Sequence, residues 1–380
     1  MKKKVLIVGN TGFALFNYRL PLMKFLSDQG WSVIGIACDE ADFEKKFKEE
    51  GIEFIHVNID HNRINPIADF RLIFKLKKVY KQESPGIVHH FGTKPAVFGS
   101  IAAKLAGISA IINTITGLDA VFMKGGFLGW AVKQLYKFGF LGRPQVIFQN
   151  NDDYCIFISK GVVKKTNAHI IFGSGVNTKD ISPASNKKHN DGLKFLLVSR
   201  MIRSKGIIEY VNASEKVKNL YPETSFIMAG GTSGGGAKGS SDAIQEEWLH
   251  DVNAKGFVKW IGRIPFDDVL VLLDNSDVVV LPSYYPEGIP RSLLEAASKG
   301  KPIITTDTPG CREVVVDSVN GFLVPPKDVN ALVNCMLKFI KQPGLAEQMG
   351  AVSRKRAVEI FDEQRVFDQI VTIYKHAVVL

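Results

Sequence analysis

The 380-residue sequence has few cysteines and no long apolar run, and both shortages limit what the protein can be. Its four cysteines, Cys38, Cys155, Cys311 and Cys335, form no CxxC pair and no regular framework, which argues against a disulfide scaffold and a structural zinc site. We therefore expect a reducing compartment. No stretch of about 18 uncharged apolar residues occurs, so we expect no membrane-spanning helix. The apolar run Val5–Val8 is too short for a signal peptide.

Two nucleotide-binding patterns are also missing. The glycine-rich segment Gly230–Asp242 has no GKS or GKT spacing, so we interpret it as a surface loop and not as a phosphate loop. The segment Gly9-Asn-Thr-Gly12-Phe lacks the third glycine of a dinucleotide fingerprint, and no acidic partner follows about 20 residues later. A nicotinamide-dependent dehydrogenase is therefore disfavoured.

What the sequence does contain is an ordinary globular composition with an uneven charge. It is 46% hydrophobic and 23% charged, and its length suits two or three domains. Residues 1–182 carry 24 Lys and Arg against 15 Asp and Glu, whereas residues 183–380 carry 24 against 23. The N-terminal half should therefore meet an anionic partner, such as a lipid surface or a phosphate-bearing substrate. We expect no nucleic-acid partner, because basic arms and nucleic-acid motifs are absent.

Short apolar runs alternate with helical patterns along both halves of the chain. Such alternation predicts an α/β protein with parallel sheets whose two faces are both covered. A helix is expected over Asn17–Gly30 and another over Val97–Ala106. The expected strands are Val5–Val8, Ser32–Ala37, Ile87–His90 and Ala110–Ile115 in the first half, then Lys194–Val198, Ser225–Met228, Val258–Ile261, Val278–Leu281 and Pro302–Thr305 in the second half.

The two series of strands predict two Rossmann-like, doubly wound domains facing across a cleft. We expect an N-terminal domain over residues 1–176, a linker over 177–192 and a C-terminal domain over 193–362. A final helix over 363–380 is expected to cross back to the first domain.

The segment Phe127–Leu141 is dense in apolar and aromatic residues, with Lys133 and Lys137 one helical turn apart. Lys124 and Arg143 add further positive charge, and no acid occurs between positions 121 and 151. Both a core helix and an interfacial helix lying on a bilayer fit this pattern.

The segment Pro282–Ala297 combines a strand end, a helix start and two carboxylates, Glu287 and Glu295. Pro290 is placed as the first helical residue, and Gly300 would close the helix. Backbone N–H groups at the start of this helix form an anion site, and the two carboxylates could accept hydrogen bonds from sugar or ribose hydroxyls. The N–H groups expected there are those of Gly288, Ile289 and Arg291.

Two further patterns also follow expected strands. Arg200 and Lys205 come directly after Lys194–Val198, where fixed cations suit a diphosphate. Gly12 follows the first strand and would let the backbone approach a phosphate closely.

These motifs resemble those of retaining glycosyltransferases of the GT-B fold, in the large family numbered four. Glu287 and Glu295 match the E-x7-E motif of that family, and Arg200 and Lys205 match its R-x4-K pair. The similarity covers nearly the whole chain and is dense from Lys194 to Phe361. The segments 16–22 and 114–118 resemble members that extend lipid-linked oligosaccharides, N-acetylgalactosaminyltransferases among them.

The resemblance implies a role for each matching residue. Glu287 would contact the hydroxyls of the donor sugar, and Glu295 would contact the ribose. Gly12 would sit beside the phosphates, Pro290 would lie at the nucleotide site, and Arg263 would lie near the base. Arg200 and Lys205 would neutralise the nucleotide diphosphate. These two cations would take the place of a metal ion, so the resemblance implies no metal and no other cofactor. The donor would be UDP-GalNAc, UDP-GlcNAc or UDP-Gal.

The sequence departs from the family at one point, because Thr116 stands where many relatives have histidine. His90, at the end of the third expected strand, is the candidate replacement, with His89 second; a structural role for either is the alternative. Arg19 and Lys94 follow strand-end loops and are the candidates for binding the acceptor diphosphate.

The resemblance therefore implies an enzyme that transfers a hexose or N-acetylhexosamine to a polyprenyl-diphosphate-linked saccharide during assembly of a capsule, an O-antigen or an N-glycan. We expect it to be cytoplasmic and peripheral on the inner face of the membrane. The alternatives are a nucleotide-sugar epimerase or hydrolase of the same fold, and a non-catalytic two-domain sugar-binding protein.

Overall fold

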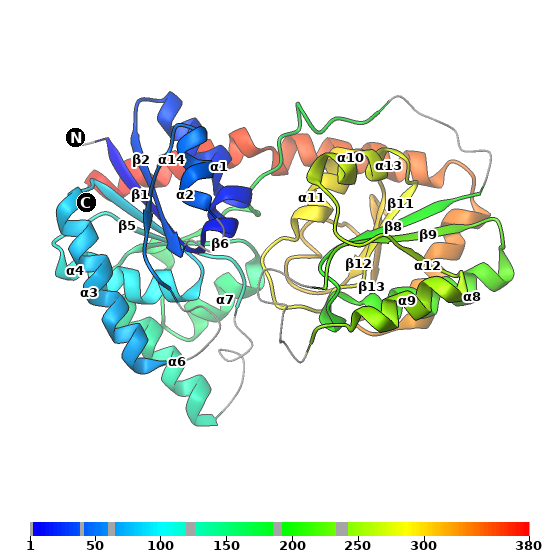
Figure 1. Ribbon diagram of the computed structural model, residues 1–380, viewed down its shortest axis with the longest axis horizontal. Helices are drawn as coiled ribbons and strands as arrows, with labels where there is room; N and C mark the ends of the chain where they lie inside the picture. The colour runs from blue at the N-terminus through cyan, green and yellow to red at the C-terminus, as the bar shows by residue number, and fades with distance from the viewer. Residues whose placement is uncertain are drawn as a thin grey trace. The chain divides into compact units, whose positions relative to one another are not determined.

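The computed structural model describes residues 3–38, 42–59, 65–118, 126–184, 192–232 and 242–379. The chain divides into two compact units (Figure 1). Unit 1 contains Met1–Ser174, Pro286–Gly288 and Arg365–Leu380, and unit 2 contains Gly175–Tyr285 and Ile289–Gln364.

Unit 1 is built on a seven-stranded parallel sheet with the strand order β3-β2-β1-β4-β5-β6-β7. The order reverses between β1 and β4, which makes the carboxyl ends of these two strands the switch point of the sheet. The strands of the unit are β1 (Lys4–Thr11), β2 (Ser32–Cys38), β3 (Glu53–His56), β4 (Ile87–Phe91), β5 (Ile111–Ile115), β6 (Gln145–Phe148) and β7 (Ala168–Ile170).

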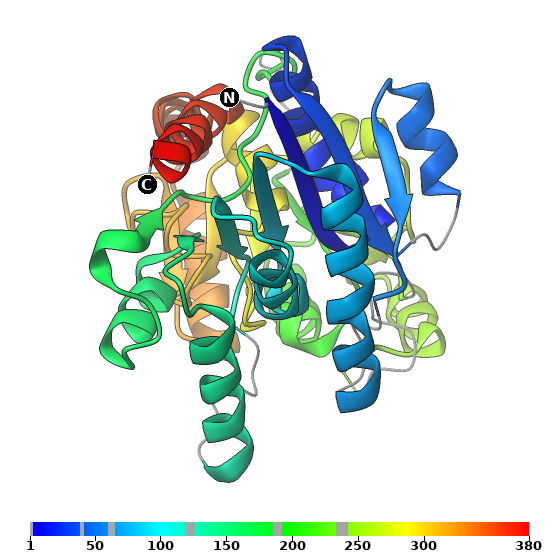
Figure 2. The ribbon, with the colours of Figure 1, turned by 90° about the vertical axis from the view of Figure 1, so that its left-hand side faces the viewer.

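The helices of unit 1 cover both faces of this sheet (Figure 2). They are α1 (Gly12–Asp28), α2 (Phe43–Glu49), α3 (Pro66–Glu83), the π-helix η1 (Pro95–Gly99), α4 (Ser100–Leu105), α6 (Gly126–Gly139), α7 (Asn151–Ser159), the 3-10 helix η2 (Lys165–Asn167) and α14 (Glu363–Val379), whose first two residues belong to unit 2.

Alternate side chains of β1 pack against different sets of helices on the two faces of the sheet. Val5 and Ile7 join a core cluster with α1, α2 and α14, whereas Leu6 and Val8 join one with α3, η1, α4, α6 and α7. Successive side chains of a strand point to opposite faces, so a strand covered on both sides must be apolar throughout.

Unit 2 repeats the same topology with a six-stranded parallel sheet, ordered β10-β9-β8-β11-β12-β13. Its switch point lies between β8 and β11. The elements are β8 (Lys194–Val198), η3 (Arg203–Lys205), α8 (Ile207–Leu220), β9 (Ser225–Ala229), α9 (Glu246–Lys255), β10 (Lys259–Trp260), α10 (Phe266–Asp274), β11 (Val278–Leu281), α11 (Arg291–Ser298), β12 (Ile303–Thr306), β13 (Gly321–Val324), α12 (Val329–Lys341), α13 (Leu345–Arg356) and the π-helix η4 (Ala357–Phe361).

The first strand and helix differ from their predicted limits. β1 runs on to Thr11, and α1 begins at Gly12 and not at Asn17, because the Thr11 hydroxyl accepts a hydrogen bond from the Ala14 N–H at 3.1 Å and caps the helix. Gly12 is therefore a buried helical residue. A Cβ there would lie 2.7 Å from the Phe43 Cβ, so close packing against α2 accounts for this glycine.

Four strands were not expected from the sequence: β3, β6, β7 and β13. Each has only three or four residues, and β3 and β7 contain histidine among few apolar positions. Such edge or near-edge strands depend on pairing with a neighbour more than on their own pattern. The expected helix over Val97–Ala106 begins two residues earlier, as η1, and continues as α4.

The division between the units falls between Ser174 and Gly175, and the expected linker residues that the structure describes belong to unit 2. Val176 explains this assignment, because its N–H donates to the Phe361 carbonyl and it forms an isolated parallel bridge with Asp362. Most of the expected Gly230–Asp242 loop, residues 233–241, lies outside the described residues. No helix among the described residues is long and apolar enough to cross a membrane.

Candidate functional site

The first group of expected site residues lies at the switch point of the unit 2 sheet. Arg200 and Lys205 follow β8, and the segment Pro282–Tyr285 follows β11, the strand paired with β8. In open parallel sheets, ligands bind outside the carboxyl ends of the strands at such a point. The fold therefore places both expected cations at the preferred ligand edge.

Tyr285 connects the two cations. The Arg200 guanidinium lies 5.2 Å from the centre of the Tyr285 ring, and the Lys205 ammonium lies 5.3 Å from it. Lys205 is buried and Arg200 is half-buried. Placing both cations beside one aromatic ring brings together two charges that an anion such as a diphosphate would neutralise.

Backbone contacts hold the loops that carry these residues. The Tyr284 N–H donates to the Ser204 carbonyl at 2.8 Å, which joins the β11–α11 loop to η3. Gly206 has a φ of 75°, and a Cβ there would overlap the Pro282 carbonyl oxygen. Only glycine allows this turn and this close approach together, so Gly206 sets the position of Lys205.

The helix after β11 starts one residue later than predicted. α11 begins at Arg291, and Pro290 is the capping residue before it, with φ −61° and ψ 123°. Ile289 and Pro290 are buried. Gly300 has a φ of 67° just after the helix, as the expected closing residue should.

Glu295 is a buried residue of α11 and forms an ion pair with Arg291 of the same helix. The Arg291 Nε lies 2.9 Å from the Glu295 Oε1, and the carboxylate is almost completely buried. Burial raises the pKa of Glu295 to about 7, although the neighbouring Arg291 charge opposes this effect. The group is therefore balanced between its acidic and ionised forms near neutral pH.

One expected donor of the anion site is already engaged. The Gly288 N–H donates to the Thr116 carbonyl at 2.7 Å, and both residues belong to unit 1. The prediction that the Gly288 N–H serves the anion site is therefore wrong, because the Thr116 carbonyl accepts this hydrogen bond. A Cβ on Gly288 would also overlap the Gln149 side chain, so no larger residue fits here. Glu287, one residue earlier, is half-buried.

Arg263 lies in the loop that follows β10. The Gly230 N–H donates to the Gly262 carbonyl at 2.8 Å, and the Trp260 indole N–H donates to the Gly230 carbonyl at 2.9 Å. Gly230 packs so closely on the Ser199 carbonyl that a Cβ would overlap it. These contacts bring the loop that carries Arg263 beside Ser199, which follows β8 and directly precedes Arg200.

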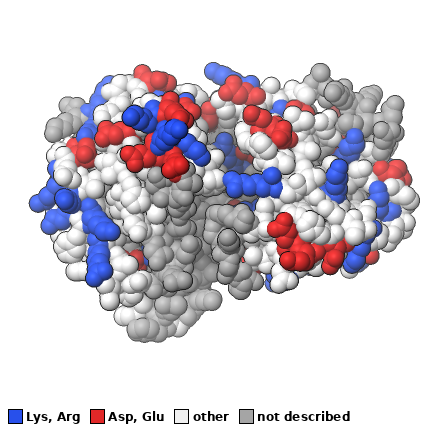
Figure 3. All heavy atoms as spheres, viewed as in Figure 1, with Lys and Arg blue, Asp and Glu red and all other residues white. Residues whose placement is uncertain are grey.

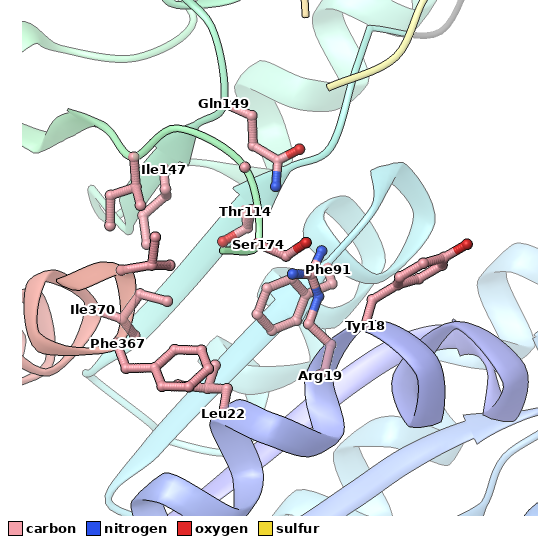
Figure 4. A pocket seen from close by; sticks show the side chains of 13 residues that line it. Tyr18, Arg19, Leu22, Phe91, Thr114, Ile147, Gln149, Ser174, Phe367 and Ile370 are labelled. Carbon is pink, nitrogen blue, oxygen red and sulfur yellow. The ribbon is translucent and has the colours of Figure 1, made fainter. Parts of the chain in front are cut away.

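A second site lies within unit 1, in a pocket that the sequence reasoning did not identify as a whole. Figure 4 shows Arg19, Thr114, Gln149 and Ser174 gathered on one side of it. Thr114 belongs to β5 and Gln149 directly follows β6, so their positions at strand ends were a signal for this site. The apolar lining includes Leu22, Ile147, Phe367 and Ile370.

The two expected acceptor residues differ in their surroundings. The Arg19 guanidinium lies 4.1 Å from the centre of the Phe91 ring and lines the pocket. The Lys94 ammonium instead lies 2.6 Å from the Asp69 carboxylate, and both side chains are largely buried. This ion pair already neutralises Lys94, so Arg19 is the better placed of the two cations.

His90 lies in the core of unit 1. Its side chain is completely buried, with Nε2 at 3.0 Å from the Tyr80 hydroxyl and Nδ1 at 2.8 Å from the Asn113 side-chain oxygen. Burial lowers the pKa of His90 to about 4. Since both ring nitrogens have protein partners, the geometry favours a structural role over the catalytic role considered from sequence.

His89 has the same character. Its Nδ1 lies 2.7 Å from the Tyr374 hydroxyl of α14, and its Nε2 lies 2.7 Å from the Thr114 hydroxyl. Burial and the Arg19 charge hold the pKa of His89 well below its usual range. His89 therefore connects α14 to Thr114 of the pocket as a neutral hydrogen-bonding group.

The raised pKa of Glu295 predicts a pH-dependent stability. Because the folded-state pKa is about 7 and the ordinary value is 4.5, this group stabilises the fold fully below about pH 4.5. That contribution is lost as the pH rises through 7, up to about 3 kcal/mol at 1.36 kcal/mol per unit. We expect thermal unfolding of wild type and Glu295→Gln to show a midpoint difference that changes between pH 4.5 and 8. A difference that stays constant across this range would contradict the assignment.

Comparisons with known proteins agree with this arrangement. Residues 4–150 match the family model described as Glycosyl transferase 4-like, and residues 178–356 match Glycosyl transferases group 1. The chain is 24% identical to the N,N'-diacetylbacillosaminyl-diphospho-undecaprenol alpha-1,3-N-acetylgalactosaminyltransferase of Campylobacter jejuni, over 98% of each chain. It is 26% identical to the UDP-Gal:alpha-D-GlcNAc-diphosphoundecaprenol alpha-1,3-galactosyltransferase of Escherichia coli, over 91% of this chain and 89% of that one.

Solved structures have the same fold. A glycosyltransferase from Rickettsia africae matches with a TM-score of 0.78 at 19% identity, covering 99% of both chains. Anabaena HepE in complex with UDP and glucose matches with a TM-score of 0.79 at 18% identity, covering 98% of this chain and 99% of that one. With two parallel-sheet α/β units and matches to both family models, the chain is a glycosyltransferase of the GT-B fold, made of a Glycosyl transferase 4-like region followed by a Glycosyl transferases group 1 region.

Proposed function

We propose that this enzyme transfers a hexose or N-acetylhexosamine from a UDP-sugar to a polyprenyl-diphosphate-linked saccharide, with retention of configuration and without a metal ion. UDP-GalNAc, UDP-GlcNAc and UDP-Gal are the candidate donors. The reaction belongs to the assembly of a cell-surface glycan. Two relatives are named for diphospho-undecaprenol-linked acceptors, and solved neighbours hold UDP, which supports both substrate classes.

The observation that carries the donor half of this proposal is the arrangement of Arg200 and Lys205 around Tyr285 in unit 2. Two cations at the carboxyl edge of the sheet stabilise the charge that develops on a departing UDP. The N-terminus of α11 adds its positive dipole end in the same loop region.

The proposed chemistry breaks the bond between the sugar C1 and the UDP oxygen and forms a bond from C1 to an acceptor hydroxyl oxygen. The acceptor attacks from the face that UDP leaves, so the configuration at C1 is retained. A phosphate oxygen of the departing UDP takes the hydroxyl proton. Glu287 would bind hydroxyls of the donor sugar, and Glu295 those of the ribose.

Metal independence is part of the proposal. Among the described residues, no three His, Cys, Asp or Glu side chains lie close enough together to hold a metal ion. Arg200 and Lys205 supply the positive charge that a divalent ion would otherwise provide.

The acceptor half of the proposal concerns unit 1. The pocket beside Arg19 combines one cation with the hydroxyls of Thr114 and Ser174 and the amide of Gln149. Such a set suits phosphate oxygens of the acceptor, since the guanidinium binds them and the neutral groups can add hydrogen bonds.

We also propose that the enzyme is peripheral on the cytoplasmic face of the membrane and that α6 contacts the lipid. Trp130 and Phe138 of this helix are each 57% exposed, and Leu141 just after it is exposed as well. Lys133 and Lys137 lie on the same helix, which carries no acid. An apolar face beside cations is typical of helices that bind anionic bilayers.

The donor site predicts kinetic losses. We expect Glu287→Ala, Arg200→Ala and Lys205→Ala each to lower kcat at least about tenfold, roughly 1.4 kcal/mol of barrier, because charge or hydroxyl binding is lost in the transition state. The measurement is UDP release with saturating acceptor. Near-normal turnover in all three variants would contradict the assignment, and so would full activity without any acceptor. If EDTA abolishes the activity and manganese restores it, the proposal that the enzyme needs no metal ion is rejected.

The acceptor site predicts a change in KM. We expect Arg19→Ala to raise the KM for a polyprenyl-diphosphate acceptor about tenfold with an unchanged donor KM, since a binding interaction common to ground and transition states is removed. Lys48→Ala, an exposed charge on α2, is the control. Lys94→Ala is paired with Asp69→Asn, because the single variant leaves a buried carboxylate unpaired. Unchanged acceptor KM in both Arg19→Ala and the double variant would reject the site.

The lipid contact of α6 is tested by vesicle co-sedimentation. We expect Trp130→Glu with Phe138→Glu to lower the fraction bound to phosphatidylglycerol vesicles, because two charges replace the apolar groups that enter the interface. Leu220→Glu, which changes a 63% exposed leucine of unit 2, is the matched control. Binding of the double variant that equals wild type would contradict a role for α6.

A further inference from the structure

Helix α3 of unit 1 has a second apolar face in addition to the one that packs on the sheet. Its buried side contains Leu72, Ile73, Leu76 and Tyr80. On another side, Ile67, Phe70 and Phe74 are 67%, 61% and 49% exposed. Their spacing of three and four residues places them on one stripe. The Phe70 and Phe74 rings meet edge to face with centroids 5.0 Å apart, so these two residues form one apolar surface.

Basic residues border this stripe on both sides. At about 100° per residue, Arg71, Lys75 and Lys78 fall on one flank of the stripe and Lys77 falls on the other, while Lys81 follows Phe74 along the line of the stripe itself. The two acids of the helix are engaged elsewhere, since Asp69 binds Lys94 and Glu83 binds Lys4. In Figure 3, basic side chains gather at the left-hand edge of unit 1, over α3 and α4. The exposed side of α3 therefore carries an apolar stripe next to a row of positive charges.

This surface continues toward α6. The segment formed by η1 and α4 packs against both α3 and α6, and α4 exposes Leu105. Both α3 and α6 extend beyond the sheet at the same end of unit 1, which Figures 1 and 2 show from two directions. Exposed apolar side chains therefore occur on three neighbouring helices of unit 1, α3, α4 and α6.

We propose that α3 is a second membrane-docking helix, which lies on an anionic bilayer with Ile67, Phe70 and Phe74 in the headgroup–acyl boundary. Arg71, Lys75 and Lys78 then bind lipid phosphates. Charge decides between a bilayer and a second copy of this chain, because two α3 faces packed symmetrically would bring their lysines together. An anionic lipid surface is complementary to both features of the stripe.

The place of the stripe connects it to the acceptor site. Asp69, on the buried side of the first turns of α3, binds Lys94 in the loop after β4, at the carboxyl edge of the sheet. Docking through α3 would therefore bring a bilayer close to the edge that carries Arg19. This consequence rests on the proposed lipid-linked acceptor, whereas lipid binding by α3 is measured independently of any reaction.

The test uses the full chain and vesicles of phosphatidylcholine with or without phosphatidylglycerol. We expect Phe70→Glu with Phe74→Glu to lower the partition coefficient onto phosphatidylglycerol vesicles at least tenfold, with the thermal midpoint retained. Arg71→Ala, Lys75→Ala and Lys78→Ala together should weaken binding and its salt dependence. The matched control is Leu220→Glu with Val271→Glu, which adds the same charge at two exposed apolar positions of unit 2. A Phe70→Trp variant should be quenched by brominated lipids more than wild type.

Each outcome decides the proposal. The proposal is overturned if the variant with Phe70→Glu and Phe74→Glu binds vesicles as wild type does. It is also overturned if the control with Leu220→Glu and Val271→Glu loses binding as well. A dimer in sedimentation velocity that Phe70→Glu with Phe74→Glu dissociates, without any change in vesicle binding, would assign the stripe to a second copy instead. Lipid binding that depends on α3 in a protein without sugar-transfer activity would reject the proposed function and leave this inference standing.

Discussion

Burial of both faces of each parallel sheet is the constraint on which the rest of this structure depends. Helices cover the two faces of the unit 1 sheet, and its central strand β1 is accordingly apolar from Val5 to Val8. Polar groups that act on a ligand must then lie where the strands end. Arg200 and Lys205 after β8, Gln149 after β6 and Thr114 in β5 all obey this rule. Polar groups that bind a ligand are therefore placed at the carboxyl edges, because helices occupy both faces of the sheet.

The basic residues of the N-terminal half lie in two different kinds of environment in the structure. Some cations are neutralised within unit 1, as Lys94 is by Asp69 and Lys4 is by Glu83. Others line an exposed surface beside apolar side chains, as Lys75 and Lys78 do on α3. Net charge by itself does not distinguish these cases, because pairing depends on which acids the fold brings near.

Individual residues show where sequence reasoning succeeds and where it does not. The cations after β8 follow a buried strand directly, so their place at the sheet edge is a local property of the chain. His90 also lies near the end of a strand, as the last residue but one of β4, yet its ring points into the core between Tyr80 and Asn113. Gly12 follows a strand as well, but the space it leaves is filled by Phe43 of α2. The direction of a side chain and the identity of its distant neighbours are set by packing, which a strand-end position does not reveal.

The amino-acid sequence by itself determined the two α/β series, the order of the motifs and the family resemblance, because these depend on short-range patterns of apolar and turn residues. Tertiary structure alone decided that Tyr285 joins Arg200 to Lys205, that Glu295 is buried against Arg291 and that Thr116 engages Gly288. It also decided that α3 has an apolar stripe left outside the core. Each of these depends on desolvation or on contact between segments far apart in the chain, and neither is encoded in local spacing.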